Sequence, residues 1–400
     1  MVRRDPTQHY KFYKLMRRIS KRSPKTAALI LGSADTLSNK LKVALTDEKG
    51  MAKSFPEVID IELTVLCNLR CPMCWWWGEN GIGFELVKNN DSLVKDQLTT
   101  VEVFRIIDQV KDHSPAIYLS GGEPFARSDA MEIIEYINKA GLGVGLTTNG
   151  TLISDDQIKR LSRLDRIRVT FSIDGPEDVH DKIRGKGNFK KTVNNIKKLS
   201  KSRPRGSSIV INTNTTFSNE ILGRTEELVE ELTSSGVDNI FFQHLWFTDE
   251  SHATEHSKFL SNAFGTDKDD GAASHIIRNI DKEFVDKLSE DVVKLQSARF
   301  IVPVKVNPKL SKDQVIQYYK NLEFSKRDRC FIPWKKVLIK ANGDVMFCPD
   351  EWVTKFNIGN IRETPLLELW TGRKAKQFRE TLFKEKLFPA CSRCCSINMG

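Results

Sequence analysis

The chain has 400 residues and a formal net charge of +10, and 40% of its residues are hydrophobic while 28% are charged. This length and composition are typical of a globular protein with two domains, each large enough to bury a core. No run approaches the roughly 18 apolar residues of a membrane-spanning helix, and the first residues lack the apolar segment of a secretory signal. We therefore expect a protein without a membrane span or a secretory signal.

The basic residues concentrate in the first 25 positions of the chain. This segment has nine Lys and Arg residues against Asp5 alone, so it contributes +8 of the total charge of +10. Apolar residues interleave with these charges, which predicts a basic helical extension over residues 1–54. Such a helix most often docks on the neighbouring domain with its charged face in solvent. The alternatives are contact with an anionic membrane or an acidic partner, and an organellar transit peptide.

Three cysteines follow the first strand-like segment. Val58–Thr64 is apolar and rich in β-branched residues, and Cys67, Cys71 and Cys74 come directly after it. Thiolates are the preferred ligands of iron-sulfur clusters, and a four-iron cluster takes four ligands. Three cysteines therefore leave one iron open to a small chelating molecule. A structural zinc site would need a fourth nearby ligand, and Trp75–Gly78 offers none.

Residues 55–248 alternate between short apolar runs that end in turn residues and segments with helical periodicity. The helical segments include 130–140, 155–164, 189–199 and 219–235. A βα unit that is repeated six times predicts an α/β fold, a partial (βα)6 barrel of the TIM type. The carboxyl ends of parallel strands lie on one side of such a barrel, where ligands bind. The six expected strands are 58–64, 116–119, 142–146, 166–172, 208–214 and 237–243.

The CxxxCxxC spacing of residues 67–74 resembles the signature of the radical S-adenosylmethionine (radical SAM) superfamily. A second motif of that family, GGEP, matches residues 121–124 after the second expected strand. The resemblance implies a 4Fe-4S cluster on the three cysteines that binds S-adenosylmethionine and cleaves it reductively to a 5'-deoxyadenosyl radical. In such enzymes the cofactor performs the difficult chemistry, while the protein orients it and shields the radical.

The same resemblance implies cofactor contacts position by position. Glu123 matches a carboxylate that receives the amino group of the methionine moiety. Met73 matches an apolar position along the adenine, and Arg184 matches an arginine that pairs with the cofactor carboxylate. The full set of implied contacts is Met73, Gly121, Gly122, Glu123, Thr148, Asn149, Ser172 and Arg184.

Two stretches are expected to set substrate choice. Residues 75–97 form a long connection with three tryptophans, which predicts a lid or pocket wall, or alternatively packing of Trp75 and Trp76 around the cluster. Residues 249–325 are rich in charge, with helical stretches such as 282–295, and are expected to bridge the two halves of the chain. Gln243 and His244 end the sixth expected strand, so we expect them to face the barrel cavity as candidate catalytic residues. A strand-end histidine is equally often a structural residue.

The segment 326–400 contains a second set of cysteines. Cys330 precedes an expected hairpin with arms 336–340 and 345–347, Cys348 ends it, and Cys391, Cys394 and Cys395 follow. This order resembles the SPASM/Twitch extension of radical SAM enzymes. It implies one auxiliary 4Fe-4S cluster on Cys330, Cys348, Cys391 and Cys394, the shorter Twitch arrangement, with Cys395 as an alternative to Cys394. A structural four-cysteine zinc site is the other interpretation, since thiolates alone do not distinguish the metals.

These patterns together predict a radical SAM enzyme built from the segments 1–54, 55–248, 249–325 and 326–400. We expect it to abstract a substrate hydrogen and to oxidise or rearrange a small metabolite such as a sugar or polyol, as an oxidoreductase of the dehydrogenase type. A Twitch-containing aminocyclitol dehydrogenase is the nearest functional analogy. The alternatives are a peptide or protein maturase of the SPASM type and a non-catalytic iron-binding adaptor.

The expected cofactors are S-adenosyl-L-methionine and two 4Fe-4S clusters, of which one binds the cofactor and the other is auxiliary. The expected partners are an external electron donor of the flavodoxin or ferredoxin type and a small-molecule substrate, with a peptide as the alternative. All cysteines except Cys395 have an expected cluster role, so a reducing, cytoplasmic location is expected rather than a disulfide framework.

Overall fold

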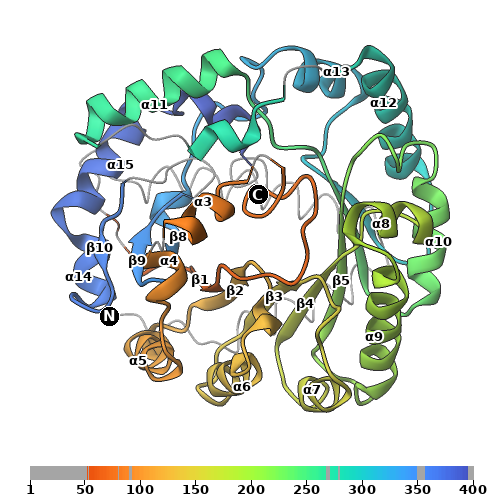
Figure 1. Ribbon diagram of the computed structural model, residues 1–400, viewed down its shortest axis with the longest axis horizontal. Coiled ribbons are helices and arrows are strands. Elements are labelled where there is room, and N and C mark those ends of the chain that lie inside the picture. The colour runs from red at the N-terminus through yellow and green to blue at the C-terminus, as the bar shows by residue number, and fades with distance from the viewer. Residues whose placement is uncertain are drawn as a thin grey trace, which may run out of the picture.

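The computed structural model describes residues 52, 54–79, 81–89, 92–266, 271–277, 280–348 and 356–394. The predictions for the basic segment 1–25 and for Cys395 lie outside these residues. Within them, one ten-stranded sheet curves into an open barrel, and helices cover its outer side (Figure 1). The strand order is β10-β9-β8-β1-β2-β3-β4-β5-β6-β7, so β1 lies inside the sheet and not at its edge.

The six strands that the sequence predicts are all present, and each pairs in parallel with the next. The α/β class and the partial barrel are therefore confirmed. Because these strands are all parallel, all six carboxyl ends lie at one edge of the sheet. The strands are β1 (Val58–Thr64), β2 (Ala116–Gly121), β3 (Val144–Thr148), β4 (Ile167–Ser172), β5 (Val210–Thr216) and β6 (Asn239–Gln243).

Four further strands extend the sheet at both edges. β7 (Val304–Asn307) pairs in parallel with β6, so the segment 249–325 adds a strand to the barrel besides bridging its halves. β8 (Lys336–Ile339) pairs in parallel with β1, and β9 (Asp344–Met346) forms with β8 the hairpin that the sequence predicts. β10 (Gly359–Asn360) adds a short antiparallel strand to β9.

The helices begin with recognisable sequence signals. Thr99 and Glu102 form a capping box at the start of α5, and Ser154 and Gln157 form one at the start of α7. No helix in the described ranges combines the length and apolarity that crossing a bilayer requires. The helices are α3 (Gly83–Lys88), α4 (Ser92–Lys95), α5 (Thr100–Val110), α6 (Ala130–Lys139), α7 (Asp155–Leu161), α8 (Glu177–Arg184), α9 (Asn188–Ser202), α10 (Thr225–Ser234), α11 (Glu250–Phe264), α12 (Lys282–Ser297), α13 (Lys312–Lys320), α14 (Leu366–Thr371) and α15 (Arg373–Glu385).

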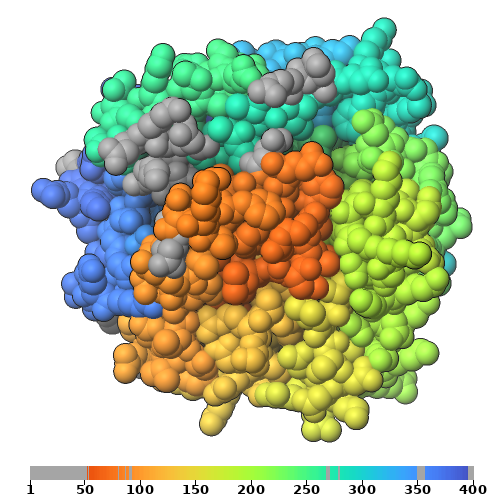
Figure 2. All heavy atoms as spheres, in the orientation of Figure 1, coloured from red at the N-terminus to blue at the C-terminus, as the bar shows by residue number. Residues whose placement is uncertain are grey.

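The connection between β1 and α5 crosses the front of the barrel. It contains the cysteine motif and the short helices α3 and α4. Figure 2 shows this segment in orange at the centre of the face, enclosed by the later elements of the chain. Since it starts at the carboxyl end of β1, it covers the side of the barrel on which the strand-end motifs lie.

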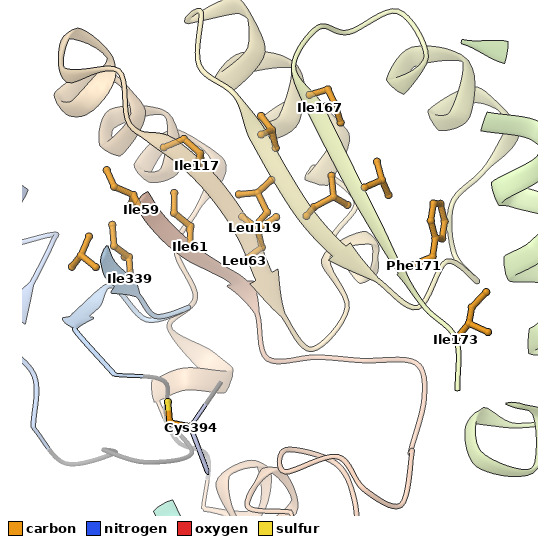
Figure 3. Close-up of a cluster of buried hydrophobic side chains, with 14 of the residues drawn as sticks. Ile59, Ile61, Leu63, Ile117, Leu119, Ile167, Phe171, Ile173, Ile339 and Cys394 are labelled. Atoms are coloured by element: carbon orange, nitrogen blue, oxygen red, sulfur yellow. The ribbon is translucent and has the colours of Figure 1, made fainter. Parts of the chain in front are cut away.

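Alternation along the strands separates an apolar outer face from a polar inner face. Ile59, Ile61 and Leu63 of β1 are buried in the main core, which lies between the sheet and the helices (Figure 3). Each fully buried side chain of this kind contributes about 1.5–3 kcal/mol to folding. Asp60 and Glu62 alternate with them and so lie on the inner face. Cys394 lies apart from the strand side chains in the same view.

The carboxyl-terminal hairpin is joined to the barrel by pairing and by ion pairs. Lys336 of β8 pairs with Asp60 of β1 at 2.8 Å, and Asp60 also accepts a hydrogen bond from Ser120 at 2.6 Å. Arg362 pairs with Glu102 at 2.6 Å, and its hydrogen bond lowers the pKa of Glu102 to about 2. The hairpin therefore continues the barrel sheet and does not form a separate layer.

Candidate functional site

The cysteine motif lies in tight turns directly after β1. The backbone N–H of Cys74 donates to the carbonyl of Cys71 at 2.9 Å, and that of Gly78 donates to Cys74 at 2.7 Å. The N–H groups of Leu69 and Trp77 point at the sulfurs of Cys67 and Cys74, each at 3.4 Å. Backbone donors of this kind stabilise thiolates, so the loop is preorganised for negatively charged sulfur ligands.

The three thiols are compatible with a cluster in which each sulfur binds a different iron. Burial raises the pKa of Cys67, and it raises that of Cys71 to about 11, so ionisation requires a compensating positive group. No three His, Cys, Asp or Glu side chains in the described part of the chain converge on one metal ion. A four-iron cluster does not require such convergence, because each thiolate binds a different iron.

Glu123 is a buried carboxylate beside this loop. It is 1% exposed and accepts hydrogen bonds from Thr148 Oγ1 at 2.7 Å, the Asn149 backbone N–H at 2.7 Å and the Phe125 backbone N–H at 3.1 Å. Burial raises its pKa, although these hydrogen bonds oppose the shift. A buried carboxylate of this kind gains stability from a cationic partner, such as the amino group that the sequence resemblance implies.

The glycine before this motif is required by backbone geometry. Gly121 has φ of +132°, and a Cβ atom there would lie 2.2 Å from the carbonyl oxygen of Thr64. The N–H of Gly122 donates to the same carbonyl at 2.7 Å. The end of β2 therefore packs closely beside the end of β1, which places the GGEP motif against the cysteine loop.

Asn149 connects the end of β3 to the cysteine loop. Its Nδ2 donates to Asn68 Oδ1 at 2.9 Å and lies 3.9 Å from the sulfur of Cys67. The expected cofactor residues Thr148 and Asn149 are thus brought to Glu123 and Cys67, as their positions after a strand predicted.

Arg184 supplies a positive charge on the other side of the loop. Its Nε donates to Asp174 Oδ2 at 2.5 Å. Burial alone would lower the pKa of Arg184, but the charges of Asp174, Cys71 and Cys74 raise it above its ordinary value. The guanidinium therefore stays charged and favours ionised thiols beside it.

The two remaining cofactor candidates also lie near these groups in the chain. Ser172 ends β4 on the inner face, two residues before Asp174. Met73 lies within the cysteine loop and is 41% exposed, so its apolar side chain is available for a ligand.

The tryptophan segment packs as a core and also covers the barrel. Trp76 and Trp77 are buried in a second apolar cluster with Val65, Leu93 and Ala341. Trp76 therefore packs in a core, as the alternative prediction states. Trp75 is only partly buried and packs against this apolar cluster. Because Ala341 follows β8, this small core attaches the cysteine loop to the carboxyl-terminal hairpin.

The structure separates Gln243 from His244. Gln243 lies on the inner face, where its Oε1 accepts from Asn214 at 3.4 Å. His244 is fully buried on the outer face, with Nδ1 3.1 Å from the hydroxyl of Tyr319 and its ring beside Phe217. Burial lowers its pKa to about 3. The prediction that both residues face the cavity is wrong for His244, because consecutive strand residues point to opposite faces.

The auxiliary cysteines gather at the end of the chain. Burial raises the pKa of Cys330 to about 12, with a further contribution from Cys394, and that of Cys391 well above its ordinary value, with contributions from Cys394 and Cys330. These three thiols are therefore close enough to interact electrostatically. Cys348 follows β9 at the end of the hairpin arm, and all cysteines in the described ranges are free thiols.

Sequence reasoning missed Asp174 and the residues that hold the auxiliary cysteines. Asp174 is visible in the Ser-Ile-Asp-Gly stretch, but its pairing with Arg184 depends on the turn into α8. The ring of Phe259 of α11 packs at a tilt against that of Phe388, just before Cys391, with the ring centroids 5.0 Å apart. Arg393, between Cys391 and Cys394, donates to the carbonyls of Asn321 and Phe324. The segment 249–325 thus supports the auxiliary site.

The fold, the open three-cysteine motif and the second cysteine set define an iron-sulfur enzyme of one family. Residues 61–232 match the model of the radical SAM superfamily, and residues 330–395 match SPASM, an iron-sulfur cluster-binding domain. The chain is a radical SAM enzyme with a SPASM domain, and its cofactors are S-adenosylmethionine and two iron-sulfur clusters. When bound, the first cluster supplies the electron that cleaves S-adenosylmethionine to a 5'-deoxyadenosyl radical.

Several curated proteins are similar to the chain. The AdoMet-dependent heme synthase of Methanosarcina barkeri is 28% identical over 353 residues, which are 85% of this chain and 88% of that protein. The Fe-coproporphyrin III synthase of the same organism is 23% identical over 86% of this chain and 82% of that protein. The mycofactocin maturase MftC of Mycolicibacterium smegmatis is 32% identical, but over only 36% of this chain and 34% of that protein.

Solved structures support the fold. SuiB of Streptococcus suis bound to S-adenosylmethionine superposes with a TM-score of 0.59 over 93% of this chain and 79% of that chain, at 16% identity. Because the identity is low, this likeness concerns the fold alone.

Proposed function

We propose that this enzyme oxidises a small, carboxylate-bearing metabolite of the tetrapyrrole class. The observation that carries the proposal is the extent of the similarity. Two relatives that align over more than four fifths of both chains are named for making heme and Fe-coproporphyrin III, whereas MftC aligns over about a third. The proposal keeps the small-metabolite class that the sequence suggested and replaces the sugar or polyol by a tetrapyrrole.

The site residues take roles that follow from their chemistry. Cys67, Cys71 and Cys74 hold the first cluster. The carboxylate of Glu123 accepts hydrogen bonds from the amino group of S-adenosylmethionine, and the guanidinium of Arg184 pairs with its carboxylate. Both charged groups of the methionine moiety thus have a partner of opposite charge. The other proposed contacts are Met73, Gly121, Gly122, Thr148, Asn149 and Ser172.

The inner face of the sheet supports a polar substrate. Asp60, Ser120 and Lys336 form a hydrogen-bonded ion-pair network there, and Asn239 donates to Asn212 at 2.9 Å. These side chains already have hydrogen-bond partners, so they can orient a ligand, and the free protein does not bear the free-energy cost of leaving them buried and unsatisfied.

The electron balance of the proposed oxidation names the remaining partners. The substrate loses one hydrogen atom, which ends in 5'-deoxyadenosine, and one electron, for which the auxiliary thiols Cys330, Cys348, Cys391 and Cys394 hold the acceptor. The cation that would remain loses one proton to solvent, which completes the two-electron oxidation. A reduced flavodoxin or ferredoxin supplies the electron for S-adenosylmethionine cleavage, and methionine is released.

The test is anaerobic reconstitution with iron, sulfide, dithionite and S-adenosylmethionine. Fe-coproporphyrin III is added to one sample and a peptide pool to another, and 5'-deoxyadenosine and product masses are measured. The tetrapyrrole should raise 5'-deoxyadenosine formation and yield a product of lower mass. Stimulation by peptides alone would favour a maturase, as the partial similarity to MftC would then suggest. If the reconstituted protein binds iron but never cleaves S-adenosylmethionine, it is the non-catalytic iron-binding adaptor.

A further inference from the structure

The inner face of the sheet divides into two sectors. The residues proposed for the cluster and for S-adenosylmethionine follow or end β1 to β4. β5, β6 and β7 contribute none of them, although their inner faces carry polar and aromatic side chains. This second sector faces the centre of the barrel and contributes no residue to the proposed cluster or cofactor site.

One row of residues runs from the cofactor sector into the second sector. Ser172 pairs with Asn214, Asn214 with Phe241, and Phe241 with Lys305, across β4, β5, β6 and β7. Directly paired residues of parallel strands lie on the same face, so this row is at the level of the cofactor residue Ser172. Three strand spacings of about 4.8 Å place Lys305 roughly 14 Å along the sheet from Ser172.

The outer-face neighbours confirm this orientation. Phe242 and Val306 come next in β6 and β7 and are buried in the main core on the helix side. Phe242 stacks on Phe217 with ring centroids 5.4 Å apart. Alternation therefore directs Phe241 and Lys305 to the inner face.

Lys305 and Phe241 form a pair with an unused charge. The ammonium of Lys305 lies 5.8 Å from the centroid of the Phe241 ring, within range of a cation–π contact. No carboxylate of the described residues pairs with Lys305, which is exposed, in contrast to Lys336 across the barrel, which pairs with Asp60. Asn214 and Gln243, which bond to each other, lie beside Phe241. The pair thus offers an ammonium, a flat aromatic surface and amide groups in one place.

We propose that Lys305 and Phe241 form a substrate subsite that binds the carboxylate and the ring face of a planar aromatic acid. The inference rests on the proposed function, because it names how a carboxylated tetrapyrrole would be recognised at the same site. The ammonium pairs with a carboxylate of the ligand, and the phenyl ring packs on its flat surface. The subsite lies across the barrel from the cofactor sector, so a bound ligand lies between the subsite and that sector.

The test uses two fluorescent probes with the same aromatic ring system, one with a charged carboxylate and the other with a neutral hydroxymethyl group. Pyrenecarboxylate and pyrenemethanol are titrated into the reconstituted full-length enzyme, and binding is followed by fluorescence. The wild type should bind the acid about tenfold more tightly than the alcohol, because one charge-assisted hydrogen bond is added. Lys305→Gln should lose this preference, Lys305→Arg should keep it, and Phe241→Leu should weaken both probes. Lys312→Gln, which removes an exposed charge on α13, is the matched control and should behave as wild type.

Two outcomes would overturn the subsite. One is a wild type that binds both probes equally or binds neither, and the other is a Lys305→Gln variant that retains the preference for the acid. Turnover of Fe-coproporphyrin III separates this failure from that of the proposed function. Loss of acid binding in Lys305→Gln without any tetrapyrrole turnover by the wild type keeps the subsite and rejects the tetrapyrrole substrate. If the wild type turns over the tetrapyrrole and Lys305→Gln does so with an unchanged KM, the tetrapyrrole substrate is kept and the subsite is rejected.

Discussion

Arg184 donates from Nε to Oδ2 of Asp174 at 2.5 Å, and this ion pair joins the segment after β4 to the last turn of α8. Asp174 is fully buried and receives a second contact, at 3.5 Å, from the backbone N–H of Thr216. The guanidinium that faces Cys71 is therefore held by a carboxylate from the sheet. If Arg184 pairs with the cofactor carboxylate as proposed, Asp174 is a positioning residue, because it acts on the cofactor through Arg184.

Asp174→Asn should weaken binding of S-adenosylmethionine by about tenfold, since Arg184, which we propose pairs with the carboxylate of this cofactor, loses its fixed orientation. Equilibrium dialysis with labelled S-adenosylmethionine on the cluster-loaded enzyme measures the effect. Asp174→Glu should recover part of the affinity because it restores the charge. The control is Asp178→Asn, an exposed position of α8 that pairs with Arg224. Equal affinity in Asp174→Asn and in the control would assign Asp174 to folding alone.

Each of Cys67, Cys71 and Cys74 should be required for S-adenosylmethionine cleavage, because a cluster with an open iron needs all three thiolates. Alanine at any one position should abolish 5'-deoxyadenosine formation and leave iron at the auxiliary site. Iron and sulfide analysis should approach two four-iron clusters in the wild type and one in the variants. A variant with wild-type cleavage would contradict the assignment. About one zinc per chain, with iron for one cluster, would identify the second site as structural zinc.

Stability should fall with acid in a way that depends on His244. Burial lowers the pKa of His244 to about 3 in the folded chain, from the ordinary histidine value of 6.5. Between these values the unfolded chain binds a proton that the folded chain does not, so stability is present above pH 6.5 and decreases as the pH falls towards 3. The contribution of His244 to the unfolding free energy changes by about 1.4 kcal/mol per pH unit at most. His244→Gln should make the loss of unfolding free energy between pH 6.5 and 5 shallower, as measured by urea denaturation.

His252 provides a control of opposite sign. Burial would lower its pKa, but hydrogen bonds with Asp249 and Glu323 raise it above 6.5. Its contribution is therefore present at low pH and is lost as the pH rises. His252→Gln should steepen the acid loss of stability where His244→Gln reduces it. Equal slopes in wild type and His244→Gln would mean that His244 is solvated in the folded chain.

How far the sequence predicts this molecule depends on the range of the interaction. The six strands and the motifs at their ends are local patterns, so residues such as Glu123 and Asn149 could be placed beside the cysteine loop. His244 was misplaced because strand alternation was not applied beyond Gln243. β7 was missed because Val304–Asn307 is short and alternates apolar with polar residues inside a charged segment. The parallel pairing of β8 with β1 joins positions almost 280 residues apart, and no local signal encodes it.

Arg362 should couple the carboxyl-terminal hairpin to the barrel. It pairs with Glu102 at 2.6 Å and donates to the carbonyls of Asn342 and Asp96, so it holds the hairpin turn against the start of α5. Arg362→Met should lower the unfolding free energy by about 1–2 kcal/mol, since the ion pair is only partly exposed and so only partly screened by solvent. Thermal unfolding measures this, with Lys376→Met in α15 as the control for loss of an exposed charge. An unchanged melting temperature would show that the hairpin is held by strand pairing alone.

The auxiliary thiols should be needed for the oxidised product and not for S-adenosylmethionine cleavage. If the auxiliary site accepts the substrate electron, Cys391→Ala should still release 5'-deoxyadenosine and should still transfer deuterium into it from a labelled substrate. The oxidised product should be lost, because the substrate radical has no acceptor for its electron. Cys330→Ala should behave in the same way, since the Cys330 and Cys391 thiols are close enough to interact. Ser392→Ala, between Cys391 and Arg393, is the matched control and should retain the product. A Cys391→Ala variant that folds, keeps the first cluster and makes full product would show that the auxiliary site is structural, and the oxidation proposed here would lose its electron acceptor.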